Sequence, residues 1–222
     1  MSSKTSLILF ITTAIIHLFA IILAIETIVF WSKPLLMITL GLYFYSASTR
    51  SIFTRWMMLG IVFSFGGDVA LLFQANAPIY FILGLASFLI AHLCYAYAMF
   101  RFPKYKEGLI AKKMWWSIPL LIYGVILVSF LWSGLGEMTV PVVIYSLVIM
   151  LMGISAVNML GRTAQQAATL IIIGALLFIL SDSIIALNKF KSAQLSIPNP
   201  RLLIMLTYIT GQFLIIRGAL KS

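Results

Sequence analysis

The sequence is poor in charge, and above all in acidic residues. Only 9% of its 222 residues are charged, just five are Asp or Glu, and 63% are hydrophobic, with a mean hydropathy of +1.12. A soluble globular domain carries about 25% charged residues. The shortage excludes an ordinary water-soluble domain and predicts an all-α, polytopic membrane protein.

Cysteine and histidine are scarce as well. Cys94 is the only cysteine, so an intramolecular disulfide is impossible, and its apolar surroundings predict a small buried hydrophobic residue. His17 and His92 are the only histidines, which excludes a three-histidine metal site, and they form no close pair on one helix. We therefore expect no metal and no other cofactor.

The net charge of +10 does not indicate a nucleic-acid partner, because the basic residues lie in short connections between apolar runs. Eight runs are long enough to cross a bilayer core of roughly 30 Å. We therefore predict an eight-helix bundle that forms one transmembrane domain over residues 1–222. The predicted spans are 7–30, 34–49, 56–74, 78–100, 115–133, 139–160, 166–188 and 202–219.

The basic residues also predict an orientation. Eight spans place both termini on one side, which then carries eleven of the basic residues, against four on the other side. Positive charge marks the cytoplasmic side, so both termini should be cytoplasmic. The first run is too long for a signal-peptide core and is interpreted as a retained helix. The small size and short loops favour a bacterial inner membrane.

Asp68 and Asp182 lie in long apolar stretches. An ionisable side chain at membrane depth is costly and by default indicates a functional site. Each aspartate comes six residues before the predicted outer end of its helix, which places both roughly 9 Å below the extracytoplasmic boundary. They could meet if helices three and seven are neighbours. A faint likeness between residues 66–72 and 180–187 also suggests a four-plus-four repeat.

Other polar residues predict a cavity open to the outer leaflet. Most of them project to the outer half or the middle of their helices, while His92 lies in the inner half of its helix; the others are Glu26, Lys33, Tyr43, Tyr145, Tyr208 and Gln212. Lys33, expected at the interface just before helix two, is a candidate for holding a lipid phosphate. Glu26 is a candidate for contacting a cationic head group.

Several segments together resemble the lysoplasmalogenase family, the YhhN-like membrane proteins. They are Lys33-Pro34-Leu35, residues 63–72 around Gly66-Gly67-Asp68, residues 84–95 around His92, residues 174–183 around Asp182, and Tyr208 to Gln212. The resemblance implies hydrolysis of the vinyl-ether bond of a lysophospholipid, the lysoplasmalogen. The expected products are a fatty aldehyde and glycerophosphocholine or glycerophosphoethanolamine.

The implied chemistry suits a pair of carboxyl groups. Hydrolysis of a vinyl ether needs an acid to protonate the double bond, a group to stabilise the oxocarbenium ion, and a base for water, as in glycosidases. Two carboxylates close together in a medium of low dielectric do not easily both ionise, so one keeps a proton. Asp68 and Asp182 are the predicted acid and base, with neither role assigned. Residues expected to orient water or a carboxyl group are His92, Tyr208 and Gln212.

Less specific interpretations stay open. The two aspartates are equally suited to a proton- or cation-coupled transporter, and a lipid-binding or assembly protein without turnover is a third possibility. Lys33 also suits a simple interfacial anchor, and His92 and His17 suit hydrogen bonds between helices. Four glycines favour close helix packing over substrate contact: Gly66, Gly67, Gly84 and Gly211. Head-group preference and oligomeric state are not predicted.

Overall fold

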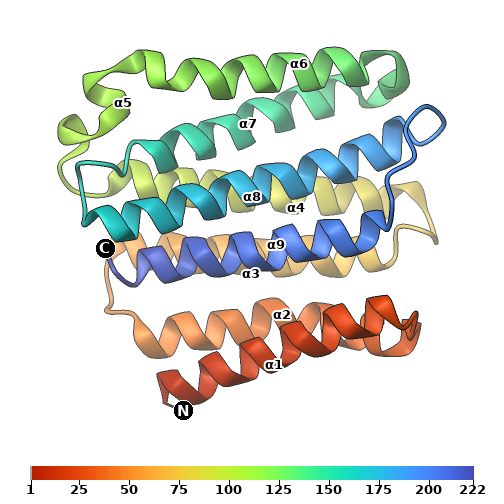
Figure 1. The fold of residues 1–222 in the computed structure, drawn as a ribbon, viewed down its shortest axis with the longest axis horizontal. Coiled ribbons are helices and arrows are strands. Elements are labelled where there is room, and N and C mark those ends of the chain that lie inside the picture. The colour runs from red at the N-terminus through yellow and green to blue at the C-terminus, as the bar shows by residue number, and fades with distance from the viewer. Residues whose placement is uncertain (1) are drawn as a thin grey trace. The chain divides into compact units, whose positions relative to one another are not determined.

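The computed structural model describes residues 2–222, which are almost entirely helical and contain no strand beyond an isolated bridge between Leu160 and Thr163. The described chain divides into two compact units, Met1–Ala98 and Met99–Ser222. The division falls near the end of helix α4 (Pro78–Arg101), so each unit contains its own set of long helices (Figure 1).

The first unit begins with a helical hairpin of α1 (Ser3–Ile22) and α2 (Glu26–Ala47). The prediction was wrong here, because it ran helix one to residue 30 and began helix two at 34. Ala24 adopts a left-handed conformation with φ of 55°, and Ile25 N–H bonds to the Ala20 carbonyl at 2.9 Å while Ala24 N–H bonds to that of Ile21. This is a Schellman ending without its usual glycine, so the sequence gives no stop signal.

Pro34 misled the prediction in the same region, because proline is common at the first position of a helix. The structure places it inside α2, eight residues after the helix begins. An interior proline lacks the N–H that would bond one turn back, and membrane helices tolerate this when neighbouring groups satisfy the backbone. Lys33 therefore lies within a helix and not in a loop.

Helix α3 (Ile52–Leu72) begins at a capping box formed by Ser51 and Thr54 and packs closely on α4. A β-carbon at Gly60 would clash with the ring of Tyr95, and one at Gly67 would clash with the ring of Phe88. These contacts confirm that glycine on α3 permits close approach to α4 and fix the register of the two helices.

The second unit contains α6 (Ile118–Leu135), α7 (Thr139–Val157), α8 (Gln165–Phe190) and α9 (Pro200–Ala219). Helices α8 and α9 approach most closely at Gly174 and Gly211, where an added β-carbon would meet backbone atoms of the other helix. Close packing at Gly211 is thus confirmed. Helices α6 and α7 form one apolar stretch, Met114–Val157, divided by the turn η3 (Gly136–Met138).

The described helices include seven to eight that are long and apolar enough to cross a membrane, depending on whether Met114–Val157 crosses once or twice. Many large apolar side chains on these helices are exposed, such as Ile8, Trp31 and Val125. So much exposed apolar surface suits a lipid environment. The chain is therefore an integral membrane protein, while the number of eight crossings, the repeat and the single domain stay predictions.

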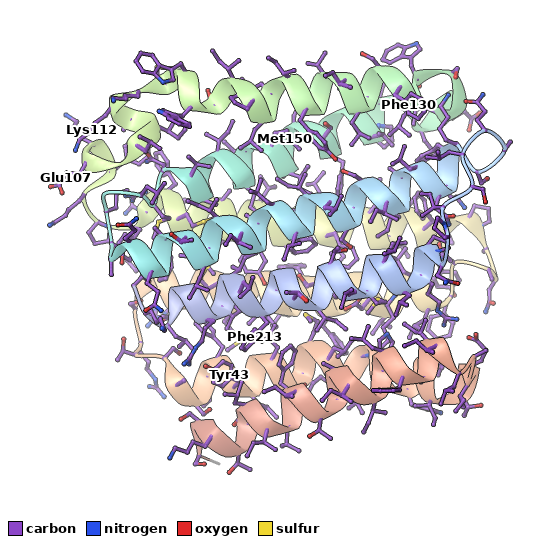
Figure 2. The ribbon with its side chains drawn as sticks, viewed as in Figure 1. Tyr43, Glu107, Lys112, Phe130, Met150 and Phe213 are labelled. Carbon is purple, nitrogen blue, oxygen red and sulfur yellow. The ribbon has the colours of Figure 1, made fainter. Side chains whose placement is uncertain are left out.

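Short helices fill the connection predicted between helices four and five: η1 (Tyr105–Glu107), α5 (Leu109–Lys112) and η2 (Met114–Ser117). Figure 2 shows Glu107 and Lys112 on this segment, near the start of α6. Buried Arg162, from the α7–α8 turn, ties the segment down. Its guanidinium donates to the carbonyls of Met99 (2.8 Å), Pro103 (3.1 Å) and Phe102. Burial lowers the pKa of Arg162 from its ordinary value, yet an arginine stays charged at neutral pH.

A second buried cation stabilises the other end of α8. Lys191 follows α8 directly, and its ammonium donates to Ser133 Oγ at 2.6 Å and Gln194 Oε1 at 3.1 Å and lies 5.2 Å from the centre of the Phe130 ring. Sequence analysis had counted Arg162 and Lys191 only as signals of membrane orientation. In the structure both also join helix ends within the second unit.

Replacing Arg162 by lysine should lower stability by about 2 kcal/mol, because an ammonium cannot reach several carbonyls in different directions as the planar guanidinium does. The measurement is the thermal unfolding midpoint of the purified protein in detergent. Arg101→Lys, at an exposed position on the last turn of α4, is the matched control and should leave the midpoint unchanged. Equal midpoints for the two variants would show that the Arg162 contacts do not stabilise the fold.

Candidate functional site

Asp68 lies on α3, four residues before the helix ends, and its side chain is 3% exposed. Lys33 on α2 lies beside it, with 3.7 Å between the Lys33 Nζ and Asp68 Oδ1 atoms. This separation makes an ion pair but is longer than a direct hydrogen bond. Because an isolated buried carboxylate is very costly, the nearby ammonium favours an ionised Asp68.

Asp182 lies on α8, half-buried, and its partner comes from α7. The Tyr145 hydroxyl donates a hydrogen bond of 2.5 Å to Asp182 Oδ2. A phenol held this close fixes the orientation of the carboxyl group and occupies one of its two oxygens. The partner of Asp182 in this contact is neutral, whereas that of Asp68 is a cation.

The serines on either side of Asp182 are engaged in holding helices together. Ser181 donates to the Ile204 carbonyl of α9 at 3.1 Å, while Ser183 donates to the Ile179 carbonyl at 2.7 Å and accepts a 2.8 Å hydrogen bond from the Tyr123 hydroxyl of α6. These bonds and the one from Tyr145 fix the rotation of α8 relative to α6, α7 and α9. The carboxyl of Asp182 is therefore on a rigid element.

The two units share one arrangement. In each, an aspartate lies near the end of the third long helix and receives a polar side chain from the second: Lys33, the eighth residue of α2, and Tyr145, the seventh of α7. The correspondence extends the faint likeness seen in the sequence to the partners of both acids.

The predicted depths of the two acids need correction. Asp68 is four residues from the end of α3 and Asp182 is eight from the end of α8, because α3 ends earlier and α8 later than predicted. At a rise of 1.5 Å per residue, these offsets are about 6 Å and about 12 Å. Measured from helix ends, the two carboxyl groups are thus not at the same level.

The candidates on α2 do not form one cluster. Glu26 is the exposed first residue of the helix, where a negative charge also stabilises the N-terminus. Lys33 lies on nearly the same face, about 10 Å further along. Tyr43 is buried another ten residues on, about 15 Å beyond Lys33 and close to the far end of α2 (Figure 2). The prediction of Tyr43 in the outer half was wrong because α2 begins eight residues earlier than expected.

His92 is fully buried on α4. The packing pairs Gly60 with Tyr95 and Gly67 with Phe88 place His92 level with about residue 63 of α3. It therefore lies roughly 7 Å along the helix axis from the level of Asp68, toward the predicted inner side. The other histidine, His17, is also buried and shares a 2.8 Å hydrogen bond between its Nδ1 and Ser32 Oγ, which joins α1 to α2.

Tyr208 and Gln212 are both buried on α9. The ring of Tyr208 packs edge-on against Phe178 of α8 at 5.3 Å between ring centres. Because Ser181 is level with Ile204, Tyr208 lies about 7 Å and Gln212 about 13 Å along the helix from the level of Asp182. Within the second unit, Tyr145 and not these two residues contacts the Asp182 carboxyl group.

A cleft of about 440 Å³ opens between α3 and α4. On α3 it is lined by Gly66, Val69, Ala70 and Phe73, which share one helix face. Asp68 is rotated by roughly 150° from the middle of that face, at 100° per residue. The cleft therefore lies on the side of α3 away from the Lys33–Asp68 pair.

Tyr145 is the contact that sequence reasoning missed as a site residue. It was ranked among the polar residues of the outer half, but helix six carries no motif and a tyrosine in a membrane helix is common. Its importance follows from a tertiary contact with Asp182. Among residues 2–222, no three His, Cys, Asp or Glu side chains are grouped as metal ligands.

The fold and its buried acids define a polytopic α-helical membrane protein with an acidic site in each unit. The chain belongs to the YhhN family, whose profile matches residues 28–219. It is similar to lysoplasmalogenase TMEM86A of Bos taurus, with 33% identity over 171 residues that cover 75% of this chain and 65% of the relative. It is also similar to lysoplasmalogenase TMEM86B of Homo sapiens, with 33% identity over 170 residues, 77% of this chain and 66% of the relative.

These comparisons confirm the family predicted from the sequence motifs. The chain spans slightly less than two thirds of the length of these curated relatives. No solved structure shows a significant match to the chain.

Removal of one member of the Lys33–Asp68 pair should be more harmful than removal of both charges. Lys33→Met leaves a buried carboxylate without its ammonium and should lower stability by about 3 kcal/mol, whereas Lys33→Met combined with Asp68→Asn should recover most of that loss. Thermal unfolding midpoints of the two variants and of Asp68→Asn measure the coupling. Strictly additive effects would show that the two charges do not interact.

Proposed function

We propose that this protein hydrolyses the vinyl-ether bond of a lysoplasmalogen-type lysophospholipid within the membrane, with Asp68 and Asp182 as acid and base. The observation that carries the proposal is a membrane-embedded acid with a dedicated polar partner in each unit, Lys33 in one and Tyr145 in the other. Membership of the YhhN family and similarity to proteins named lysoplasmalogenase support the substrate class.

The reaction requires one protonated and one ionised carboxyl group, and no other reagent than water. The protonated carboxyl adds its proton to the double-bond carbon remote from the ether oxygen, which leaves an oxocarbenium ion. Water bonds to the cationic carbon as the ionised carboxylate takes a water proton, and a hemiacetal results.

Collapse of the hemiacetal restores both groups. The carboxyl that took the water proton gives it to the glycerol oxygen as the carbon–oxygen bond breaks. The other carboxylate then removes the proton of the hemiacetal hydroxyl, which becomes the aldehyde. The two acids thus finish in their starting states, and the products are a fatty aldehyde and a glycerophospho-alcohol.

The remaining candidates have supporting roles in this proposal. Lys33 and Glu26 lie on one face of α2, where Glu26 is exposed and able to meet a choline or ethanolamine head group. His92, Tyr208 and Gln212 are buried polar residues on α4 and α9, suited to hydrogen-bonding water or the polar part of the lipid. Tyr43, near the far end of α2, fits a contact with the lipid tail.

The proposed orientation has both termini in the cytoplasm and the acids in the extracytoplasmic half, in a bacterial inner membrane. The distribution of basic residues in the sequence supports it. A lysolipid has a single chain and a polar head, so it would reach such a site laterally from the outer leaflet.

A transporter is the second candidate function. The matching acid-and-partner arrangement in the two units favours it, because transporters commonly use paired structural repeats with ionisable residues inside the membrane. Purified protein in liposomes that moves protons but releases no aldehyde from lysoplasmalogen would support transport. A protein that does neither, yet binds the lipid, would be a lipid-binding protein.

Purified wild-type protein should release free aldehyde from a lysoplasmalogen, and Asp68→Asn and Asp182→Asn should each lower kcat by at least about a hundredfold, since each removes one proton-transfer group. Aldehyde release is followed in a coupled dehydrogenase assay. Glu137→Gln changes an exposed acid in the η3 turn and should keep full activity. Near-normal turnover by either asparagine variant would reject the aspartate mechanism.

Loss of the Tyr145 hydroxyl should lower kcat by about tenfold with little change in stability, because the hydroxyl orients the carboxyl of Asp182. Tyr123→Phe is a matched control, since it removes a phenol hydroxyl that bonds to Ser183, the next residue of the same helix. Kinetics of the two phenylalanine variants provide the comparison. Equal losses would indicate that both tyrosines only hold α8 in place.

A further inference from the structure

Lys33 and Tyr145 occupy corresponding places but differ in charge. Each extends from the second long helix of its unit to an aspartate near the end of the third. One brings a permanent positive charge to within 3.7 Å of a carboxyl oxygen, and the other brings a neutral hydroxyl to 2.5 Å. If the acids were equivalent in role, this difference would have no purpose.

The ammonium favours the ionised form of Asp68. Asp68 and Lys33 are both shielded, with side chains 3% and 15% exposed, so their attraction is weakly screened by water. In such surroundings an ammonium and a carboxylate stabilise each other, while either charge alone is very costly. Protonating Asp68 would leave the ammonium of Lys33 without its opposite charge.

The hydroxyl of Tyr145 is compatible with a protonated Asp182. It donates to Oδ2, so that oxygen is an acceptor and the proton of a neutral carboxyl is left to Oδ1. The bond holds the carboxyl plane fixed, which leaves Oδ1 as the oxygen that delivers the proton. A neutral partner also adds no charge that would oppose this state.

From these contacts we infer that Lys33 is the charge partner that keeps Asp68 ionised as the base, and that Asp182, held by Tyr145, is the proton donor. The inference rests on the proposed function for its chemistry and deepens it. It gives Lys33 a positioning role in place of the predicted contact with a lipid phosphate, because its ammonium already faces a carboxylate.

Infrared spectroscopy tests the assignment without any substrate. A protonated carboxylic acid has a carbonyl stretch that is separate from the amide band and shifts in D₂O. The chain is well suited to this measurement, because it has only five Asp and Glu residues and its three glutamates are exposed. At neutral pH, an internal protonated carboxyl is therefore readily assigned by substitution.

The wild-type spectrum should show one protonated carboxyl, which disappears in Asp182→Asn and persists in Asp68→Asn. Lys33→Met should add a second protonated carboxyl from Asp68. The opposite pattern, or a wild-type protein with no such band, would overturn the assignment. The Asp68→Asn and Asp182→Asn spectra decide the question even if Lys33→Met does not fold.

Kinetics separate this role of Lys33 from phosphate binding and from a failure of the proposed function. Lys33→Met should lower kcat by about a hundredfold with KM nearly unchanged, and Lys33→Arg should restore most of the rate. A raised KM at unchanged kcat would assign Lys33 to the phosphate and overturn the inference. Lys189→Met, at an exposed position near the end of α8, is the control lysine. If wild-type protein has the predicted spectrum but releases no aldehyde, the proposed function fails while the assignment of charges stands.

Discussion

The cost of a carboxyl group in an apolar medium is the constraint on which this structure depends. Asp68 and Asp182 are two of only five acidic side chains, and each is held by a polar group from a neighbouring helix. Such partners fix the rotation and register of the helices that carry them, because a slip of one residue would leave a charge or a hydroxyl facing hydrocarbon. The same contacts that stabilise the fold therefore also position the reactive groups.

Helix packing provides the rigidity that these contacts need. Glycines at 60, 67, 174 and 211 bring backbones together, and hydroxyl bridges such as that from Tyr123 to Ser183 prevent rotation. In a membrane, apolar burial gives little drive for helices to associate, so van der Waals contact and hydrogen bonds must do so. Buried Arg162 and Lys191 do the same work at the helix ends, where the chain meets water.

Much of the fold was predictable from sequence, for identifiable reasons. Long apolar runs set off by charged or turn residues gave α4 within one residue at each end, and the motifs gave the family, which the comparisons confirm. The α1–α2 turn was misplaced because Ala24 takes a left-handed conformation that alanine rarely adopts and because Pro34 lies inside a helix. The level of Tyr43 was wrong for the same reason. For the site, both aspartates were found by their cost, whereas Tyr145 was ranked as one polar residue among several.

Composition and periodicity by themselves determined that this chain is a helical membrane protein, which helices carry the acids and which family it belongs to, because those properties depend only on how polar and apolar residues follow one another. Only the tertiary structure decided which side chain faces each acid: a cation for Asp68 and a phenol for Asp182. Those pairings join residues that are 35 and 37 positions apart, and they depend on helix rotation and crossing, which no local pattern in the sequence specifies.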